Sequence, residues 1–243
     1  MAAIIIFAVI GCILQAVFIA VEHKEKYVGA VILKGSASVM FIVVGFLSWK
    51  LSQTTFFNLG GGNFLEINKV AQPESFAKLV LIGLVLGGVG DVLLNLRFVF
   101  EKLGQKIFLA GIAAFLAGHI LYLAALIPLS ESLWLCIIIG AVIAACVLAY
   151  IFKTMEVKTS FKVFGIFYLG AVIIMTAIAV GNLIAAPAAL TWFYAVGAVL
   201  FTVSDIVLIF NTFSGTTKFS LRITNLSLYY AGQLLIAMSL MFA

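Results

Sequence analysis

Charged residues are scarce in this chain of 243 residues, at 9% of the sequence against 65% hydrophobic residues. A soluble domain carries roughly a quarter charged residues. The polar surface is therefore too small to cover a water-exposed globule, and the surplus apolar surface must face lipid. The apolar runs are long and continuous rather than alternating, which favours membrane-spanning helices over a closed barrel.

Cysteine and histidine are also rare. Cys12, Cys136 and Cys146 are an odd set inside apolar runs without metal-ligand spacing, and we interpret them as small packing residues. The only histidines are His23 and His119, whereas catalytic zinc usually takes three protein ligands, often two or three of them histidine. We therefore predict no metal and no cofactor.

The apolar runs predict an all-α polytopic membrane protein with a single bundle of about eight helices. The expected spans are 2–21, 28–48, 76–96, 106–127, 131–151, 161–184, 188–210 and 221–242. The first run has its charges after it rather than before it, so we expect a retained helix and not a signal peptide. One long connection, 49–75, holds the glycines of 60–62, and no second domain is visible within 1–243.

Lysine and arginine are divided unevenly between the two ends of the spans. Ten lie in the loops after odd-numbered spans, three lie on the other side, and Lys34 lies inside a span. This split predicts that the basic loops face the cytoplasm and that both termini face away from it. We expect an integral membrane protein, in the inner (cytoplasmic) membrane if the source is bacterial. The net charge of +5 reflects this orientation signal and indicates no nucleic-acid partner.

A few strongly polar side chains interrupt the spans, and such residues usually mark function or a necessary pair. They are Lys34, Asp91, His119, Asp205 and Gln233, with Gln15, Asn95 and Asn182 as weaker members. At a rise of 1.5 Å per residue, both aspartates lie about 8 Å from the cytoplasmic ends of their helices. We therefore expect a pocket in the cytoplasmic half, formed by the two aspartates and His119 and lined also by Lys34 and Gln233.

Each of these residues also has a structural interpretation. Lys34 and Asp91 could form a structural ion pair, and Asp205 could accept a hydrogen bond from Ser204 or a helix end. His119 could equally be a hydrogen-bonded core residue, and Gln233 could orient a neighbour. Tyrosines near membrane interfaces commonly act as anchors, which applies to Tyr122, Tyr168, Tyr229 and Tyr230.

Four segments of the chain resemble the YhhN family, whose characterised members are lysoplasmalogenases. Residues 90–94 read GDVLL, like the family's G-D-x-x-L, and 115–122 read FLAGHILY, like F-x-x-x-H-x-x-Y. Residues 197–205 read GAVLFTVSD, like G-A-x-L-F-x-x-S-D, and 230–236 read YAGQLLI, similar to the family's last motif. Two features depart from the family: glycine follows Lys34 where proline is common, and 49–75 looks like an insertion.

The resemblance implies hydrolysis of the vinyl ether bond of a lysophospholipid, the lysoplasmalogen. The products would be a fatty aldehyde and glycerophosphocholine or glycerophosphoethanolamine. The implied catalytic residues are Asp91, Asp205 and His119, and the implied supporting or substrate-binding residues are Lys34, Tyr122, Tyr168, Ser204, Tyr230 and Gln233.

The chemistry suits these residue types independently. Protonation of the alkene gives an oxocarbenium ion, so the reaction asks for one protonated acid and one ionised carboxylate, as in glycosidases. The charges of Lys34, Asp91 and Asp205 sum to −1, and one added proton would make the set neutral. Which aspartate is the acid stays open, as does the oligomeric state.

Two other functions compete with this hypothesis. A proton- or ion-coupled transporter of a small or lipidic substrate would also use intramembrane charges, but alternating access needs polar lining on both sides of the site. A receptor or structural protein would leave two carboxylates at matched depth unexplained.

Overall fold

Eight long helices make up nearly all of the protein. The computed structural model describes residues 1–58, 72–155, 159–213 and 217–243. Within these residues the chain forms no strand, and all eight helices are long and apolar enough to cross a membrane. The prediction of an all-α polytopic bundle is confirmed. The helices are α1 (Ala2–His23), α2 (Tyr27–Asn58), α3 (Ser75–Leu96), α4 (Gly104–Leu126), α5 (Leu133–Thr154), α6 (Thr159–Ala185), α7 (Ala189–Phe213) and α8 (Phe219–Ser239).

The three prolines lie at helix boundaries. Pro73 precedes α3, Pro128 lies in the short 3-10 helix η3 (Ile127–Leu129) after α4, and Pro187 separates α6 from α7. Proline lacks a backbone N–H and clashes with the preceding turn, so each of these positions tolerates it where a helix interior would not.

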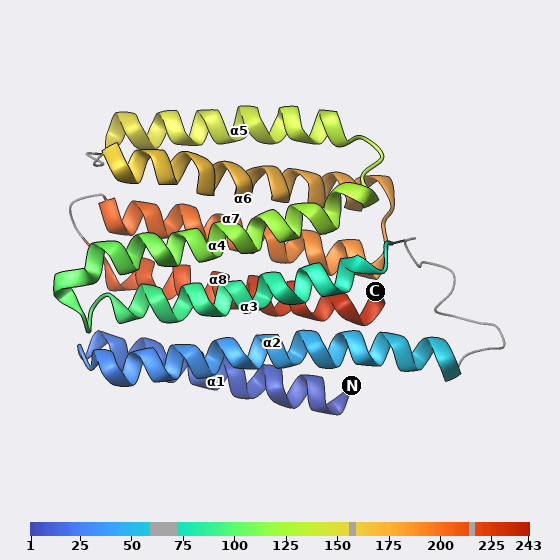
Figure 1. Ribbon diagram of the computed structural model, residues 1–243, viewed down its shortest axis with the longest axis horizontal. Coiled ribbons are helices and arrows are strands. Elements are labelled where there is room, and N and C mark those ends of the chain that lie inside the picture. Colours follow the sequence, from blue (N-terminus) through green and yellow to red (C-terminus); the bar gives the residue numbers. More distant parts are fainter. Residues whose placement is uncertain (59–71, 156–158, 214–216) are drawn as a thin grey trace.

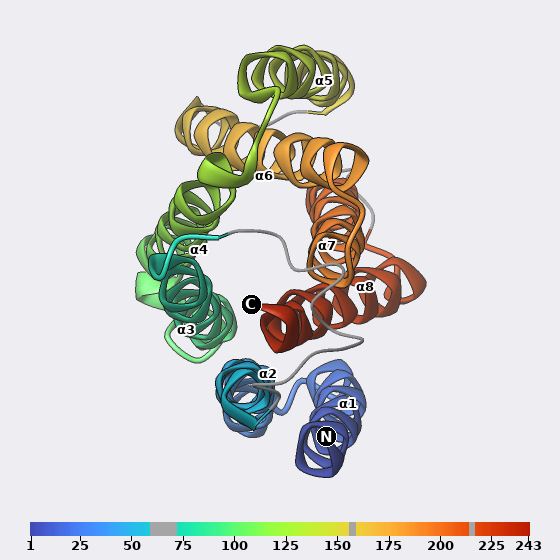
Figure 2. The same cartoon turned by 90° about the vertical axis from the view of Figure 1, so that its right-hand side faces the viewer.

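The helices run roughly parallel to one axis (Figure 1) and form a ring-like arrangement when viewed along that axis (Figure 2). The helices α3, α4, α6, α7 and α8 surround the centre, and α2 packs against α3 and α8. The two remaining helices are peripheral: α1 packs on α2 and α8, and α5 packs on α6. Large apolar side chains are exposed on both of them, including Ile5, Ile13, Ile138 and Val142. Such a surface suits contact with lipid.

Glycines bring α8 close to α7 and α3. A Cβ atom on Gly197 would lie 2.8 Å from the carbonyl oxygen of Gly232, and one on Gly87 would lie 2.8 Å from Nε2 of Gln233. Small residues allow such close approach of membrane helices. The consequence is that polar residues of α8 reach side chains of α3 inside the bundle.

The α1–α2 and α3–α4 connections and the C-terminal ends of α5 and α7 lie at one end of the bundle, and both termini lie at the other (Figure 1). We call the first the basic end, because it carries Lys24, Lys26, Arg97, Lys102 and Lys218. Its orientation toward the cytoplasm remains our prediction. Two of the counted lysines, Lys69 and Lys158, lie outside the described residues.

One predicted span differs clearly from the structure. The helix α2 continues to Asn58, past the expected end at residue 48, and so includes the first part of the segment 49–75. The residues 49–53 read WKLSQ, in which lysine, leucine and glutamine favour a helix and no glycine or proline ends it. The glycines of 60–62 lie outside the described residues.

Candidate active site

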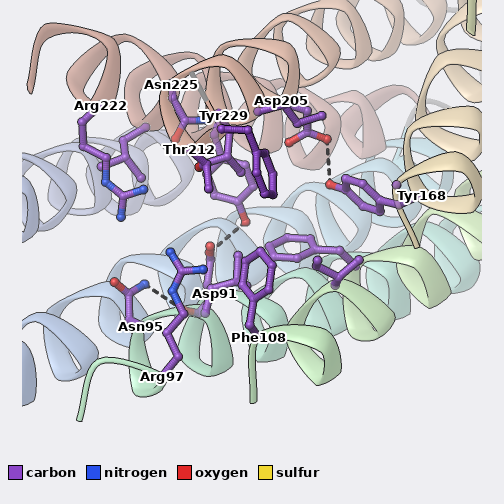
Figure 3. A pocket seen from close by; sticks show the side chains of 18 of the residues that line it. Asp91, Asn95, Arg97, Phe108, Tyr168, Asp205, Thr212, Arg222, Asn225 and Tyr229 are labelled. Atoms are coloured by element: carbon purple, nitrogen blue, oxygen red, sulfur yellow. Dashed lines mark hydrogen bonds between the residues drawn. The ribbon is translucent and has the colours of Figure 1, made fainter. Parts of the chain in front are cut away.

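A cavity of about 130 Å³ lies inside the bundle, toward the basic end. It has room for several water molecules, since one water occupies about 10–15 Å³ by this measure. Apolar side chains from α4, α5 and α7, among them Phe108, Ile151 and Ile209, form much of its wall. A deeper set of polar residues lines it about one and a half turns or more from the helix ends, namely Lys34, Asp91, Tyr168, Asp205 and Tyr229. Figure 3 shows Asp91 and Asp205 on opposite walls, as expected for two carboxylates that share one pocket.

Asp91 on α3 is 4% exposed and has three polar partners. Its Oδ2 accepts hydrogen bonds from the Ser38 hydroxyl at 2.5 Å and the Tyr229 hydroxyl at 2.8 Å. The Lys34 ammonium lies 3.4 Å from Oδ1. A neighbouring cation and hydrogen-bond donors both favour the ionised form of a carboxyl group. The surroundings of Asp91 are therefore those of a carboxylate.

Lys34 is buried, and its ammonium group contacts residues on the same wall of the pocket as Asp91. Besides Asp91, its Nζ donates to Oε1 of Gln15 at 3.2 Å and lies 4.4 Å from the centre of the Tyr229 ring. Gln15 in turn donates to the carbonyl of Leu226 at 3.2 Å. The sequence left two partners open for Lys34, a carboxylate or a substrate phosphate, and the structure contains the pair with the carboxylate.

Asp205 on α7 is also 4% exposed, but its surroundings are much poorer in polar groups. Its Oδ2 accepts a hydrogen bond from the Tyr168 hydroxyl at 2.7 Å (Figure 3). Within the described residues this is its only hydrogen bond, and no cation lies within ion-pair distance of it. The expected bond from Ser204 is not formed there. The other oxygen of Asp205 accepts no hydrogen bond from the described residues.

His119 does not line the pocket, although the sequence placed it there. Its Nδ1 lies 2.7 Å from the carbonyl oxygen of Phe115, and its Nε2 has no hydrogen-bond partner in the described part of the chain. The imidazole packs edge-on against the rings of Tyr168 and Phe201, with centroids 5.6 and 4.7 Å away. His119 therefore touches the site through Tyr168.

Gln233 likewise lies behind the lining residues. Its Oε1 accepts a hydrogen bond from the Tyr122 hydroxyl at 3.3 Å, and its Nε2 donates to the Tyr229 hydroxyl at 3.4 Å. The Tyr229 hydroxyl donates to Asp91. These contacts join Tyr122, Gln233 and Tyr229 in one hydrogen-bonded chain that ends on the carboxylate, so Gln233 orients a neighbour.

Two other predicted residues, Ser204 and Tyr230, do not line the pocket and instead take part in hydrogen bonds between helices. The amide of Asn225 donates to the carbonyl of Ser204 at 2.8 Å and to its hydroxyl at 3.2 Å, which joins α8 to α7. The Tyr230 hydroxyl donates to the carbonyl of Ala37 at 3.0 Å, which joins α8 to α2.

A second polar set lines the outer part of the pocket, made up of Asn95, Arg97, Thr212, Arg222 and Asn225. Of these, the sequence singled out only Asn95, as a weaker intramembrane polar residue. Arg222 forms a bidentate ion pair with Glu22, in which Nε lies 3.0 Å from Oε2. Both arginines had been counted only as loop charges. The signal that could have found them is position: Arg97 follows Asp91 by six residues, so it lies about 9 Å away along the helix axis, within reach of the same pocket.

These additional residues change the charge of the site. Three cations and three carboxylates now balance when all are ionised, namely Lys34, Arg97, Arg222, Glu22, Asp91 and Asp205. The sequence-based set of three residues had a net charge of −1.

The fold and the pocket define a polytopic membrane protein with two buried carboxylates facing a common internal cavity. The chain belongs to the YhhN family, whose sequence model matches residues 34–240. The matched region includes Lys34, Asp91, Asp205 and every other predicted site residue. No curated protein and no solved structure matches the chain.

Proposed function

We propose that this protein hydrolyses the vinyl ether bond of lysoplasmalogens to a fatty aldehyde and glycerophosphocholine or glycerophosphoethanolamine. The observation that carries the proposal is the unequal pair of buried carboxylates, Asp91 and Asp205, on opposite walls of a cavity large enough for water. Family membership supports it, because lysoplasmalogenase activity is what the resemblance to YhhN proteins implies.

Asp205 is the better general acid. A protonated carboxyl group keeps its carbonyl oxygen as an acceptor for Tyr168 while the other oxygen carries the proton. This proton goes to the alkene carbon farther from the ether oxygen, and the π electrons form the new C–H bond. The adjacent carbon and the ether oxygen then share the positive charge of an oxocarbenium ion.

Asp91 is the better ionised partner, since Lys34, Ser38 and Tyr229 all favour its carboxylate form. Its negative charge stabilises the cation and accepts a proton from the water that attacks the cationic carbon, which gives a hemiacetal. In the collapse, Asp91 returns this proton to the departing glycerol oxygen while Asp205 takes the proton of the hemiacetal hydroxyl. One water is consumed, and both carboxyl groups regain their starting states.

The charge balance of the pocket fits this assignment. A substrate phosphate would add one negative charge to a set that is neutral when fully ionised. A proton on Asp205 restores neutrality, which a low-dielectric site favours. The arrival of the phosphate and the protonation of the acid are therefore coupled.

The transporter hypothesis gains no support from the arrangement of polar groups. The polar lining belongs to the half of the bundle nearer the basic end. Toward the other end the described core contains large apolar and aromatic side chains such as Phe76, Leu84 and Tyr194. Alternating access would need a polar path on that side as well.

The test is hydrolysis of a defined lysoplasmalogen by purified protein, with aldehyde release as the readout. Asp91→Asn and Asp205→Asn should each lower kcat by at least about 100-fold, because asparagine can neither exchange a proton nor carry charge. Glu101→Gln, an exposed carboxylate at the basic end, is the matched control and should keep full activity.

A lysolipid with an alkyl ether in place of the vinyl ether should bind without being cleaved, because it has no alkene carbon to protonate. Rapid cleavage of that lipid, or full activity in both asparagine variants, would overturn the proposed mechanism.

A further inference from the structure

Arg97 lies directly after α3 and projects into the outer part of the pocket (Figure 3). Its guanidinium carbon lies 4.6 Å from the centre of the Phe98 ring and 4.5 Å from that of Phe108. Its Nε is buried without a hydrogen-bond partner in the described residues. Arginine is always protonated in proteins, so this is a largely enclosed positive charge with an unused donor.

The other two cations of the pocket are already compensated. Lys34 pairs with Asp91, and Arg222 is held by both carboxylate oxygens of Glu22. Among the cations that line the pocket in the described part of the chain, Arg97 is the one without a carboxylate within ion-pair distance. The site therefore has one positive charge to offer, and it lies at the basic end.

Enclosing a guanidinium without a counter-ion is unfavourable, and two aromatic rings offset only part of the cost. An anionic ligand would supply the missing charge. The planar fork of arginine matches the two oxygens of a phosphate group better than any other side chain does. The unused Nε–H of this enclosed cation, together with its charge, therefore points to a phosphate monoester or diester.

We propose that Arg97 binds the phosphate group of a lysophospholipid at the basic end of the pocket. The identification of the ligand as a lysolipid rests on the proposed function, whereas the recognition of phosphate rests on Arg97 and its surroundings. This assignment replaces Lys34, whose charge is used by Asp91.

The proposed contact sets the direction of the substrate. Arg97 lies six residues after Asp91, about 9 Å along the helix axis, and its long side chain spans part of that distance. Only the glycerol backbone separates the phosphate of a lysoplasmalogen from its vinyl ether. With the phosphate at Arg97, the vinyl ether lies near Asp91 and Asp205.

The test measures binding and does not depend on hydrolysis. Two uncleaved ligands are titrated into purified protein in the same detergent: a 1-alkyl lysophospholipid and the 1-alkylglycerol of equal chain length, which has no phosphate. Arg97→Gln should lower the affinity for the lysophospholipid by about 10-fold or more, since a charge-assisted hydrogen bond is worth roughly 1.5–3 kcal/mol. The affinity for the alkylglycerol should stay unchanged.

Two further variants sharpen the result. The affinity of Arg97→Lys for the lysophospholipid should lie between those of wild type and Arg97→Gln, because lysine keeps the charge and loses the planar guanidinium group. It also carries the test if Arg97→Gln does not fold. Lys102→Gln removes an exposed charge from the same end outside the pocket and should bind both ligands as wild type does.

Inorganic phosphate and glycerophosphocholine are added as competitors to separate a lipid site from a site for the free anion. Failure of millimolar inorganic phosphate to displace the alkyl lysophospholipid supports the lipid, and efficient displacement makes Arg97 a site for free phosphate. An equal loss of affinity for both alkyl ligands, or no loss for either, would overturn the role of Arg97. Neither ligand is cleaved, so these binding outcomes do not depend on whether the protein hydrolyses lysoplasmalogens. The aspartate variants test hydrolysis separately.

Discussion

The two walls of the pocket place the same residue type at similar depth in very different surroundings. On the α3 wall, Asp91 contacts Lys34, Ser38 and Tyr229. On the α7 wall, Asp205 contacts Tyr168 as its one hydrogen-bond donor in the described residues. The difference teaches that neighbours, and not depth, separate the roles of two membrane carboxylates, as environment does in other acid–base pairs.

The construction of each wall follows from helix packing. Gly87 lets Gln233 of α8 approach α3, and the chain from Gln233 through Tyr229 then reaches Asp91. The α6–α7 contact is simpler, with the Thr176 and Thr202 hydroxyls 2.6 Å apart. Asp91 is therefore part of a network that spans five helices, α1, α2, α3, α4 and α8, whereas Asp205 has a single hydrogen bond, to α6, in the described residues.

The largest difference between the walls should appear in stability. Asp91→Asn removes one partner of a buried ion pair and should cost about 3–5 kcal/mol, because Lys34 is left uncompensated. Asp205→Asn removes no ion pair and should change the free energy of unfolding by less than about 1 kcal/mol. Thermal or denaturant unfolding of the purified protein in detergent measures both.

The double variant Lys34→Met/Asp91→Asn is the matched control for this comparison. It removes both charges and should regain most of the lost stability without regaining hydrolysis. Equal destabilisation by the two single asparagine variants would mean that the walls do not differ as their contacts indicate.

A smaller difference should appear in turnover when the tyrosine on each wall is replaced. Tyr168→Phe leaves Asp205 without a described donor and should lower kcat by roughly 10-fold, the value of one hydrogen bond to an ionisable group. Tyr229→Phe should lower kcat by a smaller factor. Asp91 keeps its contacts with Ser38 and Lys34, and phenylalanine keeps an aromatic ring beside Lys34. A lower kcat in Tyr229→Phe than in Tyr168→Phe would mean that Asp91 is the acid and Asp205 the ionised partner.

Composition and motif position predicted much of this arrangement. Hydropathy predicted eight spans, and counting residues along α3 and α7 placed Asp91 and Asp205 in the same half of the bundle, where both line the cavity. Depth follows from the fixed rise of a helix, so it can be read from sequence.

The rotation of a helix about its axis was harder to predict. His119 and Gln233 lie at the expected level but behind Tyr168 and Tyr229, since an apolar helix in lipid has no clear amphipathic face to orient it. Arg97 was missed for a related reason: a basic residue after a span is usually an orientation signal, and the inward course of its side chain depends on tertiary contacts with Phe98 and Phe108.

His119 provides the smallest and most discriminating test of the α7 wall. Its ring packs on Tyr168, which donates to Asp205, so we expect it to position the acid and not to exchange the proton itself. His119→Phe keeps an aromatic ring and loses the contact with the Phe115 carbonyl, whereas His119→Gln keeps a hydrogen-bonding group and loses the ring. Positioning by the ring predicts that His119→Phe retains more activity than His119→Gln, with kcat losses below about 10-fold in both. If instead both variants lose as much kcat as Asp205→Asn, then His119 is the proton donor and the comparison of the two walls has assigned the acid to the wrong residue.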